Sequence, residues 1–430
     1  MENLYYPART QWAHLPVAEV VDGEVALRGR MLDVSGGKGK LQDQTGEIEL
    51  NIGDIATKVK SGDIVELAGS VVGGKISVSV IRLLTPVVDT WQRGDWQRFS
   101  SSASKIRENI TLRAKILHAI HRFFNSREFV AVETPILSGG SAQEEQIQLF
   151  ATEYRQGKTT QRVYLAPSPE LYMKRLLGVG MERIYQITRS FRNGELGPLH
   201  NPEFAILEWY RAYASYEEVM VDIEQLVAYV AEKTTGKPSI IRQGQVVDLT
   251  PPWPRISVHE AFERWAGIDL QICPEVGNLF SRAVALGYAS VTPLDSWEDI
   301  FHKIFLEQIE PNLASMGTVH LLDYPRQLAA LAKQKEEYPA VVERTEAFVG
   351  GVELTNGYTE LNDPTEQRGR FTTGREQSAV DGAPIDQAFL DAMECGFPPA
   401  GGVALGVDRL VMLIAGADRL DEVIAFPMGL

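Results

Sequence analysis

Residues 183–211, RIYQITRSFRNGELGPLHNPEFAILEWYR, hold two segments of alternating apolar and polar residues on either side of a loop with glycine and proline. Alternation with a period of two is typical of strands, and a Gly/Pro loop between two such segments predicts a turn. We therefore predict a long β-hairpin. Arg189, Arg192 and His200 lie in or beside its loop, although the chain has a net charge of −15. Because facing arginines usually bind an anion, we expect this hairpin to line an anion site.

The chain around the hairpin divides into parts with different patterns. Residues 15–86 alternate apolar with polar residues and are broken by QTG and VGG turns, which predicts about five short strands in a small β-barrel over residues 1–90. A polar stretch with tryptophans predicts a linker at 91–104. Residues 105–430 mix amphipathic helices with antiparallel hairpins and lack regular βαβ alternation. The predicted fold class is α+β, an antiparallel sheet flanked by helices and preceded by the barrel.

Three segments of the larger part carry more specific predictions. In SPELYMKRLL, Ser168 is the expected N-cap of a helix and Pro169 its first residue. Residues 215–345 are predicted to be mostly helical. Residues 401–416, GGVALGVDRLVMLIAG, are predicted to form a strand that runs through Gly406 into a helix.

The composition of the chain limits its functional class. There are 57 acidic against 42 basic residues among 430, which argues against a large non-specific surface for nucleic acid. The two cysteines, Cys273 and Cys395, lie in no CxxC or Cys/His cluster, so we expect reduced thiols. The first residues contain no apolar signal sequence, and the apolar run near the C-terminus is interrupted by Asp408 and Arg409. These features predict a cytoplasmic protein without a membrane segment.

Two groups of carboxylates are candidates for chemistry. Glu346 and Glu353 flank two glycines between expected strands, and such a pair suits Mg²⁺, which takes one or two carboxylates together with substrate phosphates. Glu170, Glu208 and Glu360 stand in apolar or aromatic surroundings. A carboxylate among apolar neighbours is costly unless a cation pairs with it. The partners are therefore expected to be arginines, namely Arg189, Arg192 and Arg409, or the ammonium groups of a ligand.

Each of these residues also has a purely structural interpretation. Glu170 is equally suited to a helix N-terminus, Glu360 to a solvated strand and Arg409 to a helix surface. Phe204 suits the core, and His200 suits a loop. Composition and periodicity alone leave both interpretations open.

Three segments resemble, in the right order, the three signature motifs of class II aminoacyl-tRNA synthetases. FFNSREFVAVETPIL, with Pro135, is similar to motif 1, which forms a dimer interface in that class. RSFRNGELGPLHNPEFAILEWY is similar to motif 2, and GGVALGVDRLVML, with Arg409, to motif 3. Within the class, SPELYMKRLL, HNPEF and VELTNGYTELND resemble the lysyl branch. The resemblance implies a class II catalytic domain at 105–430, an OB-fold in front of it and a homodimer.

The resemblance also implies a role for individual residues. Arg192 would bridge the α-phosphate of ATP and the substrate carboxylate, and would stabilise charge as the carboxylate attacks phosphorus. Phe204 and Arg409 would sandwich the adenine, and His200 would lie by the outer phosphates. Asn193 and Glu195 would complete the ATP contacts. Glu346 and Glu353 would hold Mg²⁺. Glu170 and Glu208 would bind one substrate ammonium group, and Glu360, Tyr210 and Asn356 the other.

Several residues resemble a paralogue of the lysyl enzymes, the elongation factor P lysine ligases, which attach β-lysine to a lysine side chain of that factor. Ser168 stands where the synthetases usually have alanine, Trp209 is typical of the paralogue, and Ala404 stands where synthetases typically have glycine. A methyl group at Ala404 is expected to narrow the pocket near the substrate amine and to favour an amine one carbon further along. The resemblance therefore implies lysine or β-lysine as substrate and elongation factor P as acceptor.

The barrel bears on tRNA as the other acceptor. OB-folds stack unpaired bases on exposed aromatic residues, but no Phe, Tyr or Trp occurs between Trp12 and Trp91. Residues 15–86 also carry ten acidic against eight basic residues, so we expect a poor anticodon reader and no tRNA partner. Charging of lysine tRNA stays the alternative function, because the known elongation factor P lysine ligases are short proteins that lack such a barrel. A non-catalytic protein is a third reading, since Gly194 replaces the usual motif 2 glutamate and Glu195 comes one place late.

Overall fold

The computed structural model describes residues 12–88, 95–100, 105–142, 147–329, 331–377 and 383–429. The chain divides into two compact units, Met1–Ser104 and Lys105–Leu430. Of the predicted linker at 91–104, residues Asp95–Ser100 form the short helix α1, and the others lie outside the described residues. Among the helices that the structure describes, none has the length and apolarity needed to cross a bilayer.

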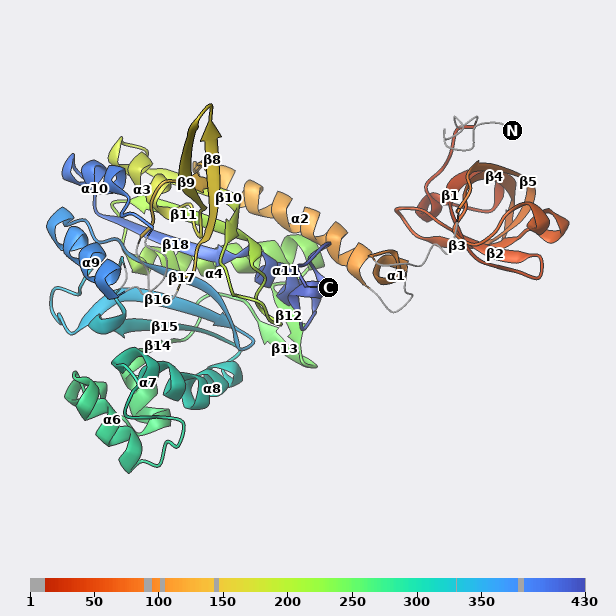
Figure 1. Ribbon diagram of the computed structural model, residues 1–430. Helices are drawn as coiled ribbons and strands as arrows, with labels where there is room; N and C mark the ends of the chain where they lie inside the picture. Colours follow the sequence, from red (N-terminus) through yellow and green to blue (C-terminus); the bar gives the residue numbers. More distant parts are fainter. Residues whose placement is uncertain are drawn as a thin grey trace. The chain divides into compact units, whose positions relative to one another are not determined.

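The first unit is a closed five-stranded barrel with the strand order β1-β2-β3-β5-β4 (Figure 1). Alternate residues of its strands point inward, and Leu27, Met31, Leu41, Val65 and Leu67 form a fully buried centre. The predicted barrel, an OB-like region, is thus present. Its strands are β1 (Gly23–Ser35), β2 (Lys38–Gln42), β3 (Glu47–Asn51), β4 (Ile64–Val72) and β5 (Lys75–Thr85).

The second unit is built on an eight-stranded sheet of order β14-β15-β16-β17-β18-β11-β10-β6. It is antiparallel except for the pairs β14–β15 and β10–β6. The predicted hairpin forms its β10–β11 pair, in which Phe191 lies opposite Glu203. The strands are β6 (Val130–Ala131), β10 (Arg183–Phe191), β11 (Glu203–Ala212), β14 (Arg255–Ser257), β15 (Thr318–Pro325), β16 (Val341–Val349), β17 (Val352–Thr359) and β18 (Ala400–Gly406).

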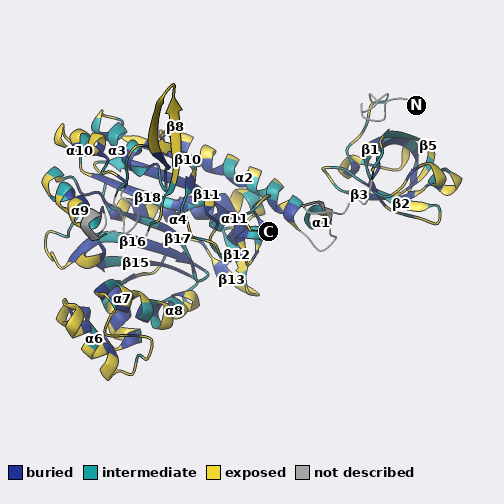
Figure 2. Ribbon diagram, viewed as in Figure 1, coloured by how far each residue is buried: buried dark blue, intermediate teal, exposed yellow. Residues whose placement is uncertain are grey.

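Helices cover one face of this sheet (Figures 1 and 2). Apolar residues of α2, α4 and α11 pack in one core with Leu207 and Trp209 of β11 and Leu405 of β18. Because side chains alternate along a strand, the intervening residues of β11 and β18 point to the opposite face. The larger helices are α2 (Ile106–Asn125), α3 (Glu170–Gly178), α4 (Tyr216–Thr235), α9 (Pro364–Gln377), α10 (Gln387–Glu394) and α11 (Val407–Ala415).

The region predicted to be mostly helical, 215–345, is more mixed than expected. Besides α4, it holds the hairpin β12 (Ser239–Arg242) and β13 (Gln245–Asp248), the strands β14 and β15, and a second core around Phe262 and Phe301. Strand β14 escaped prediction because its partner β15 is about sixty residues away in sequence. The hairpin β12–β13 is local, with Gln243 and Gly244 as its loop, but its strands have only four residues each. Its other helices are α5 (Val258–Ala261), α6 (Val276–Ala285), α7 (Trp297–Ile304) and α8 (Glu310–Ser315).

The strand-to-helix prediction at the C-terminal end is confirmed, since β18 ends at Gly406 and α11 begins at Val407. Helix α3 begins at Glu170, one residue later than predicted, and the Ser168 hydroxyl accepts the Glu170 backbone N–H at 3.0 Å. An exposed hairpin, β8 (Phe150–Gln156) and β9 (Thr159–Leu165), pairs with β7 (Leu137–Ser138) in a separate small sheet. Both cysteines are free.

Candidate active site

The sheet face opposite α2 and α4 lines an open cavity of about 1680 Å³. Sites for small ligands are usually about 300–1,000 Å³, so this cavity has room for a nucleotide and an amino acid together. Cross-strand pairing places one row of residues side by side on its floor. The row runs from β10 to β16 through Gln186, Glu208, Ala404, Asn356 and Glu346, and all of these except Gln186 line the cavity.

Glu208 occupies the second position of this row and is 1% exposed. Its two carboxylate oxygens accept hydrogen bonds from the hydroxyl of Ser168 (2.6 Å) and the hydroxyl of Tyr210 (2.9 Å). Burial raises the pKa of Glu208 to about 8, and the neighbouring carboxylate of Glu170 adds to the rise. An isolated buried carboxylate is costly, so the ionised form of Glu208 favours a cationic ligand.

Glu170 and Glu360 share a cation that the chain itself supplies. The ammonium group of Lys174 donates to Oε1 of Glu170 at 2.5 Å and also contacts Oε2 of Glu360. The hydroxyl of Tyr358 donates to the same oxygen of Glu170. The other oxygen of Glu360, Oε1, is buried, and no described residue donates a hydrogen bond to it. Burial raises the pKa of Glu360 to about 8, although Lys174 opposes the rise.

A second cluster lies near the hairpin loop. The guanidinium carbon of Arg192 is 5.3 Å from the ring centroid of Phe204, within range of a cation–π contact. Its Nη1 is 3.9 Å from Oε1 of Glu195, and both side chains are about a third exposed. The arginine is thus held beside an aromatic ring but remains open to the cavity. This arrangement suits an anionic ligand with a flat ring.

Arg409 joins the hairpin loop to β17. Its guanidinium donates to the Glu353 carbonyl oxygen at 2.6 Å and lies 3.4 Å from Oε2 of the same residue. It is also 3.0 Å from Nε2 of His200. Burial lowers the pKa of His200, and the positive charge of Arg409 lowers it further. His200 is therefore neutral at pH 7, which suits the arginine contact.

Glu346 and Glu353 both line the cavity. Glu346 is buried, accepts a hydrogen bond from Arg344 at 2.7 Å, and has a raised pKa because of burial, with Glu353 adding to the rise. The charge of Glu353 is thus close enough to disfavour ionisation of Glu346. Among the described residues there is no group of three or more His, Cys, Asp or Glu residues suited to a metal ion. The donor set therefore fits Mg²⁺ only if a ligand adds oxygen atoms, as nucleotide phosphates do.

Ala404 lies between Glu208 and Asn356 in the floor row, and its strand neighbours on the same face are Gly402 and Gly406. Its methyl group therefore stands between two glycines on the cavity side. Asn356 accepts a hydrogen bond from Nε of Arg344 at 3.2 Å. The side chains of Glu208 and Asn356, on either side of the methyl, are thus each held by hydrogen bonds from neighbouring residues.

Arg189 and Asn193 do not line the cavity with the other predicted residues. Arg189 is not a partner of the buried carboxylates, because it alternates with Gln186 along β10 and points away from the floor row. It lies 3.7 Å from the exposed Glu203 instead. Asn193 is exposed, and its backbone N–H donates to the carbonyl of Gln148 at 2.8 Å.

Gly194 follows Asn193 with a backbone φ of +79°. Residues with a Cβ adopt this left-handed conformation only at a cost. A glutamate at this position would be strained in the observed loop, so the glycine and the loop conformation belong together.

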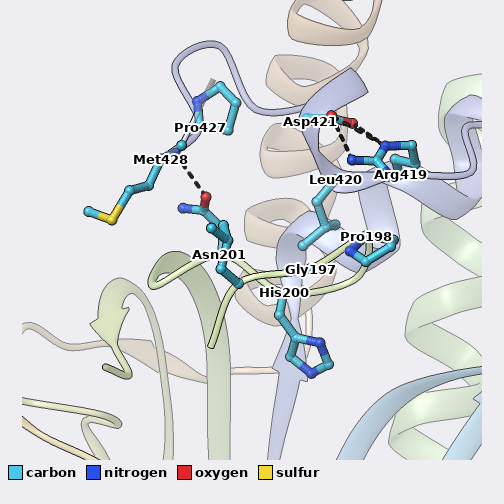
Figure 3. A pocket seen from close by; sticks show the side chains of 11 residues that line it. Gly197, Pro198, His200, Asn201, Arg419, Leu420, Asp421, Pro427 and Met428 are labelled. Atoms are coloured by element: carbon cyan, nitrogen blue, oxygen red, sulfur yellow. Dashed lines mark hydrogen bonds and ion pairs between the residues drawn. The ribbon is translucent and has the colours of Figure 1, made fainter. Parts of the chain in front are cut away.

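The loop is attached to the C-terminal end of the chain. Figure 3 shows the Asn201 side chain directed at Met428, whose backbone N–H donates to its Oδ1 at 3.0 Å, whereas the His200 ring points the other way. The Leu420 backbone N–H donates to the Pro198 carbonyl at 2.9 Å. A small cavity of about 180 Å³ separates these segments. The C-terminal segment thus supports the back of the loop that carries His200.

Three residues of the site were missed by sequence reasoning: Lys174, Tyr358 and Arg344. Lys174 had a readable signal, since it lies four residues after Glu170 on a predicted helix. Tyr358 and Arg344 face each other across β16 and β17. Their contacts depend on strand register, which no local pattern reveals.

Comparison with known proteins agrees with this geometry. Residues 93–429 match the family described as tRNA synthetases class II (D, K and N). A lysine–tRNA ligase of Moorella thermoacetica is 36% identical over 95% of this chain and 89% of its own length. Those of Pelotomaculum thermopropionicum and Synechococcus sp. (strain CC9311) are 34% and 33% identical, over 95% and 98% of this chain and 87% and 92% of their own. The chain belongs to the class II tRNA synthetase family of the D, K and N type.

Proposed function

We propose that this protein activates lysine or β-lysine with ATP and forms an aminoacyl-adenylate. The observation that carries the proposal is the cluster of three cavity-lining carboxylates, Glu170, Glu208 and Glu360, with a single resident cation. Such a cluster favours a ligand with ammonium groups. Relatives named lysine–tRNA ligase support the same class of substrate.

In the proposed reaction an oxygen of the substrate carboxylate attacks the α-phosphorus of ATP, and the bond to pyrophosphate breaks. Arg192 is placed to bind both the α-phosphate and the attacking carboxylate, so that it stabilises the charge of the transition state. Phe204 and Arg409 would hold the adenine, and His200, Glu195 and Asn193 would contact the remainder of the nucleotide. Of these, Asn193 needs a loop movement, since it lies outside the cavity lining.

Glu346 and Glu353 are the residues that would hold Mg²⁺. The ion would neutralise phosphate charge when bound. Glu208 and Glu170 are assigned to one substrate ammonium group, with Ser168 orienting Glu208. Glu360, Tyr210 and Asn356 are assigned to the other.

The raised carboxylate pKa values predict that substrate affinity depends on pH. A protonated carboxyl group does not pair with an ammonium ion, so substrate must displace the protons of Glu208 and Glu360. Below about pH 8, the pKa of both groups, the KM for lysine should rise by about tenfold per pH unit for each proton displaced. Pyrophosphate exchange between pH 6 and 8 measures this. A KM that is constant over the range would contradict it.

We propose elongation factor P as the acceptor, through the ε-amine of one of its lysines. The support comes from the barrel, which has no aromatic residue from 13 to 90 on which a base can stack. Several of its basic groups are already paired: Lys75 lies 2.8 Å from Glu49, and Arg82 contacts Glu66. These two basic residues are therefore less available to phosphates.

Charging of lysine tRNA is the second candidate, and one observation favours it. The second unit, residues 105–430, is about three quarters of the chain. An alignment over 95% of the chain with a lysine–tRNA ligase therefore includes most of the barrel. The similarity to a lysine–tRNA ligase thus extends to the unit that would read the anticodon if tRNA were the acceptor.

The acceptor is tested by intact mass. Elongation factor P, or lysine tRNA, is incubated with the full chain, ATP, Mg²⁺ and each lysine isomer. A gain of one lysyl residue on the factor with uncharged tRNA supports the proposal and names the isomer. Charged tRNA with an unmodified factor establishes the second candidate. If neither acceptor changes and no pyrophosphate exchange occurs, the proposed activation is wrong.

We also propose a homodimer through the segment that resembles motif 1. Val130, Ile136 and Leu137 are 39–50% exposed there, and β6 is the edge of the large sheet. Exposed apolar residues beside a free sheet edge favour association. Light scattering that gives the mass of a single chain, 47.7 kDa, would exclude the dimer.

Replacing Ala404 with glycine is expected to shift preference from β-lysine toward α-lysine. Removal of the methyl widens the floor between Glu208 and Asn356. One methyl group in a pocket is worth about 1–3 kcal/mol, so the ratio of kcat/KM values should change by about 10-fold or more. Pyrophosphate exchange with both isomers measures the ratio. Equal responses of the two isomers would show that the methyl does not select between them.

A further inference from the structure

Lys174 is a buried lysine to which the adenylation reaction assigns no role. Its side chain is 2% exposed, although lysine is rarely buried without a partner. It contacts Oε1 of Glu170 at 2.5 Å and Oε2 of Glu360, and its ammonium nitrogen is 5.2 Å from the centroid of the Tyr358 ring. The ammonium group thus bridges two carboxylates that come from α3 and from the end of β17.

Lys174 lies behind these carboxylates and does not itself face the ligand. Glu170, Glu208, Glu360 and Tyr358 line the cavity, whereas Lys174 is not among the described residues that do so. Each carboxylate that it contacts keeps one oxygen clear of it. For Glu360 this is the buried Oε1, which receives no hydrogen bond from the described residues. The lysine therefore orients the carboxylates toward the cavity.

The net charge of the cluster determines how many ammonium groups a ligand must bring. Once all three carboxylates are ionised, they and Lys174, the one ammonium group that the described residues place in this cluster, leave two uncompensated negative charges next to the cavity. An amino acid with two ammonium groups neutralises both, whereas one with a single ammonium group leaves a buried charge unpaired, which is costly.

We propose that Lys174 is a positioning residue that fixes the fully ionised carboxylate cluster at two negative charges and so selects amino acids with two ammonium groups. The inference rests on the proposed function, because it concerns the substrate of the same site. A lysine that merely filled space would act through its methylene groups alone.

The groups that surround Lys174 determine how its replacement changes the protonation of the carboxylates. They are Glu170 on its own helix, Glu360 and Tyr358 from β17 and its end, and Glu208 from β11, while Tyr210 of β11 adjoins the three carboxylates. Without the ammonium, Glu170 and Glu360 become two neighbouring buried carboxylates. Such a pair holds its protons more tightly than in the unmodified protein, because two like charges are not stable side by side and no ammonium offsets them. Substrate then displaces these protons at a greater cost than in the unmodified protein.

The test is calorimetric binding of lysine to the full-length protein and to Lys174→Met, between pH 6.5 and 9. Methionine keeps much of the side-chain length but removes the charge. We expect the Kd for lysine to rise by about 30-fold or more at pH 7. The ratio of the two Kd values should shrink as pH rises, because the carboxylates then ionise in both proteins. A ratio of one, or a raised ratio that does not vary with pH, would overturn the proposal.

A matched control is Lys303→Met. Lys303 on α7 forms an ion pair with Asp295 at 2.6 Å, is 35% exposed and does not line the cavity. This variant should bind lysine as the unmodified protein does. Norleucine, which lacks the second ammonium group, should bind far more weakly than lysine to the unmodified protein. Equal binding of the two would also contradict the proposal.

A second readout needs no substrate. As the carboxylates ionise between pH 6 and 9, Lys174→Met should lose thermal stability relative to the unmodified protein, since no resident cation offsets their charge. The unmodified protein retains its ammonium over this range, because the pKa of Lys174 is raised by Glu170 and Glu360 despite burial. If the unmodified protein fails to bind lysine, the proposed function is wrong, and the stability profile still decides the role of Lys174. Parallel profiles would exclude that role.

Discussion

Replacing Arg192 with glutamine is expected to lower the rate of adenylate formation by about 10²–10³-fold, the usual effect of removing one group that stabilises transition-state charge. Its guanidinium is beside Phe204, is open to the cavity and has only a 3.9 Å contact with Glu195. It is therefore free to bind an anion. The loss should appear mainly in kcat, because the charge develops in the transition state.

Arg189→Gln is the matched control for this prediction. Arg189 lies three residues earlier, on β10, and is 3.7 Å from the exposed Glu203. Exposed ion pairs contribute at most about 1 kcal/mol to stability, so pyrophosphate exchange should be unchanged. An equal loss in both variants would mean that the hairpin as a whole, and not the Arg192 charge, controls the reaction.

Gly402→Ala is expected to abolish lysine binding while leaving ATP binding in place. A Cβ at Gly402 would lie 2.1 Å from Oε1 of Glu360 and 2.3 Å from Cε1 of Tyr210. Both side chains line the cavity, so the added methyl would displace them into the space for the ligand. Overpacking of this kind costs about 1–3 kcal/mol of stability. Displacement of a carboxylate from its ammonium partner costs about 2–5 kcal/mol of binding, so the KM for lysine should rise about 30-fold or more.

Gly277→Ala controls for the general effect of adding a methyl group. Gly277 lies in α6, has no atom within 4 Å of an added Cβ and has no left-handed backbone. Alanine there should stabilise the helix by up to about 1 kcal/mol. Calorimetric titration of Gly402→Ala with lysine and with an ATP analogue separates the two sites. Normal lysine affinity would show that Glu360 does not contact the ligand.

The sequence alone determined the elements whose signal is local. The hairpin of residues 183–211, the barrel and the strand-to-helix passage at Gly406 follow from alternation and from turn residues, and the structure has all three. Residues 215–345 were harder to predict. Strand β14 has only three residues and pairs with β15 about sixty residues away, so no nearby residue indicates the pairing. The hairpin β12–β13 is local, but its strands have only four residues each.

For the site, too, the sequence determined one part and the tertiary structure the other. Glu170, Glu208 and Glu360 were recognisable from the sequence as carboxylates in apolar surroundings, because burial of a charge always demands a partner. Which partner each one has depends on contacts between segments that are distant in sequence. Glu360 meets Lys174 across 186 residues, and strand register alone places Ala404 between Glu208 and Asn356. Local residue patterns thus determined which groups are present, whereas tertiary packing decided how they are paired and how much charge is left for a ligand.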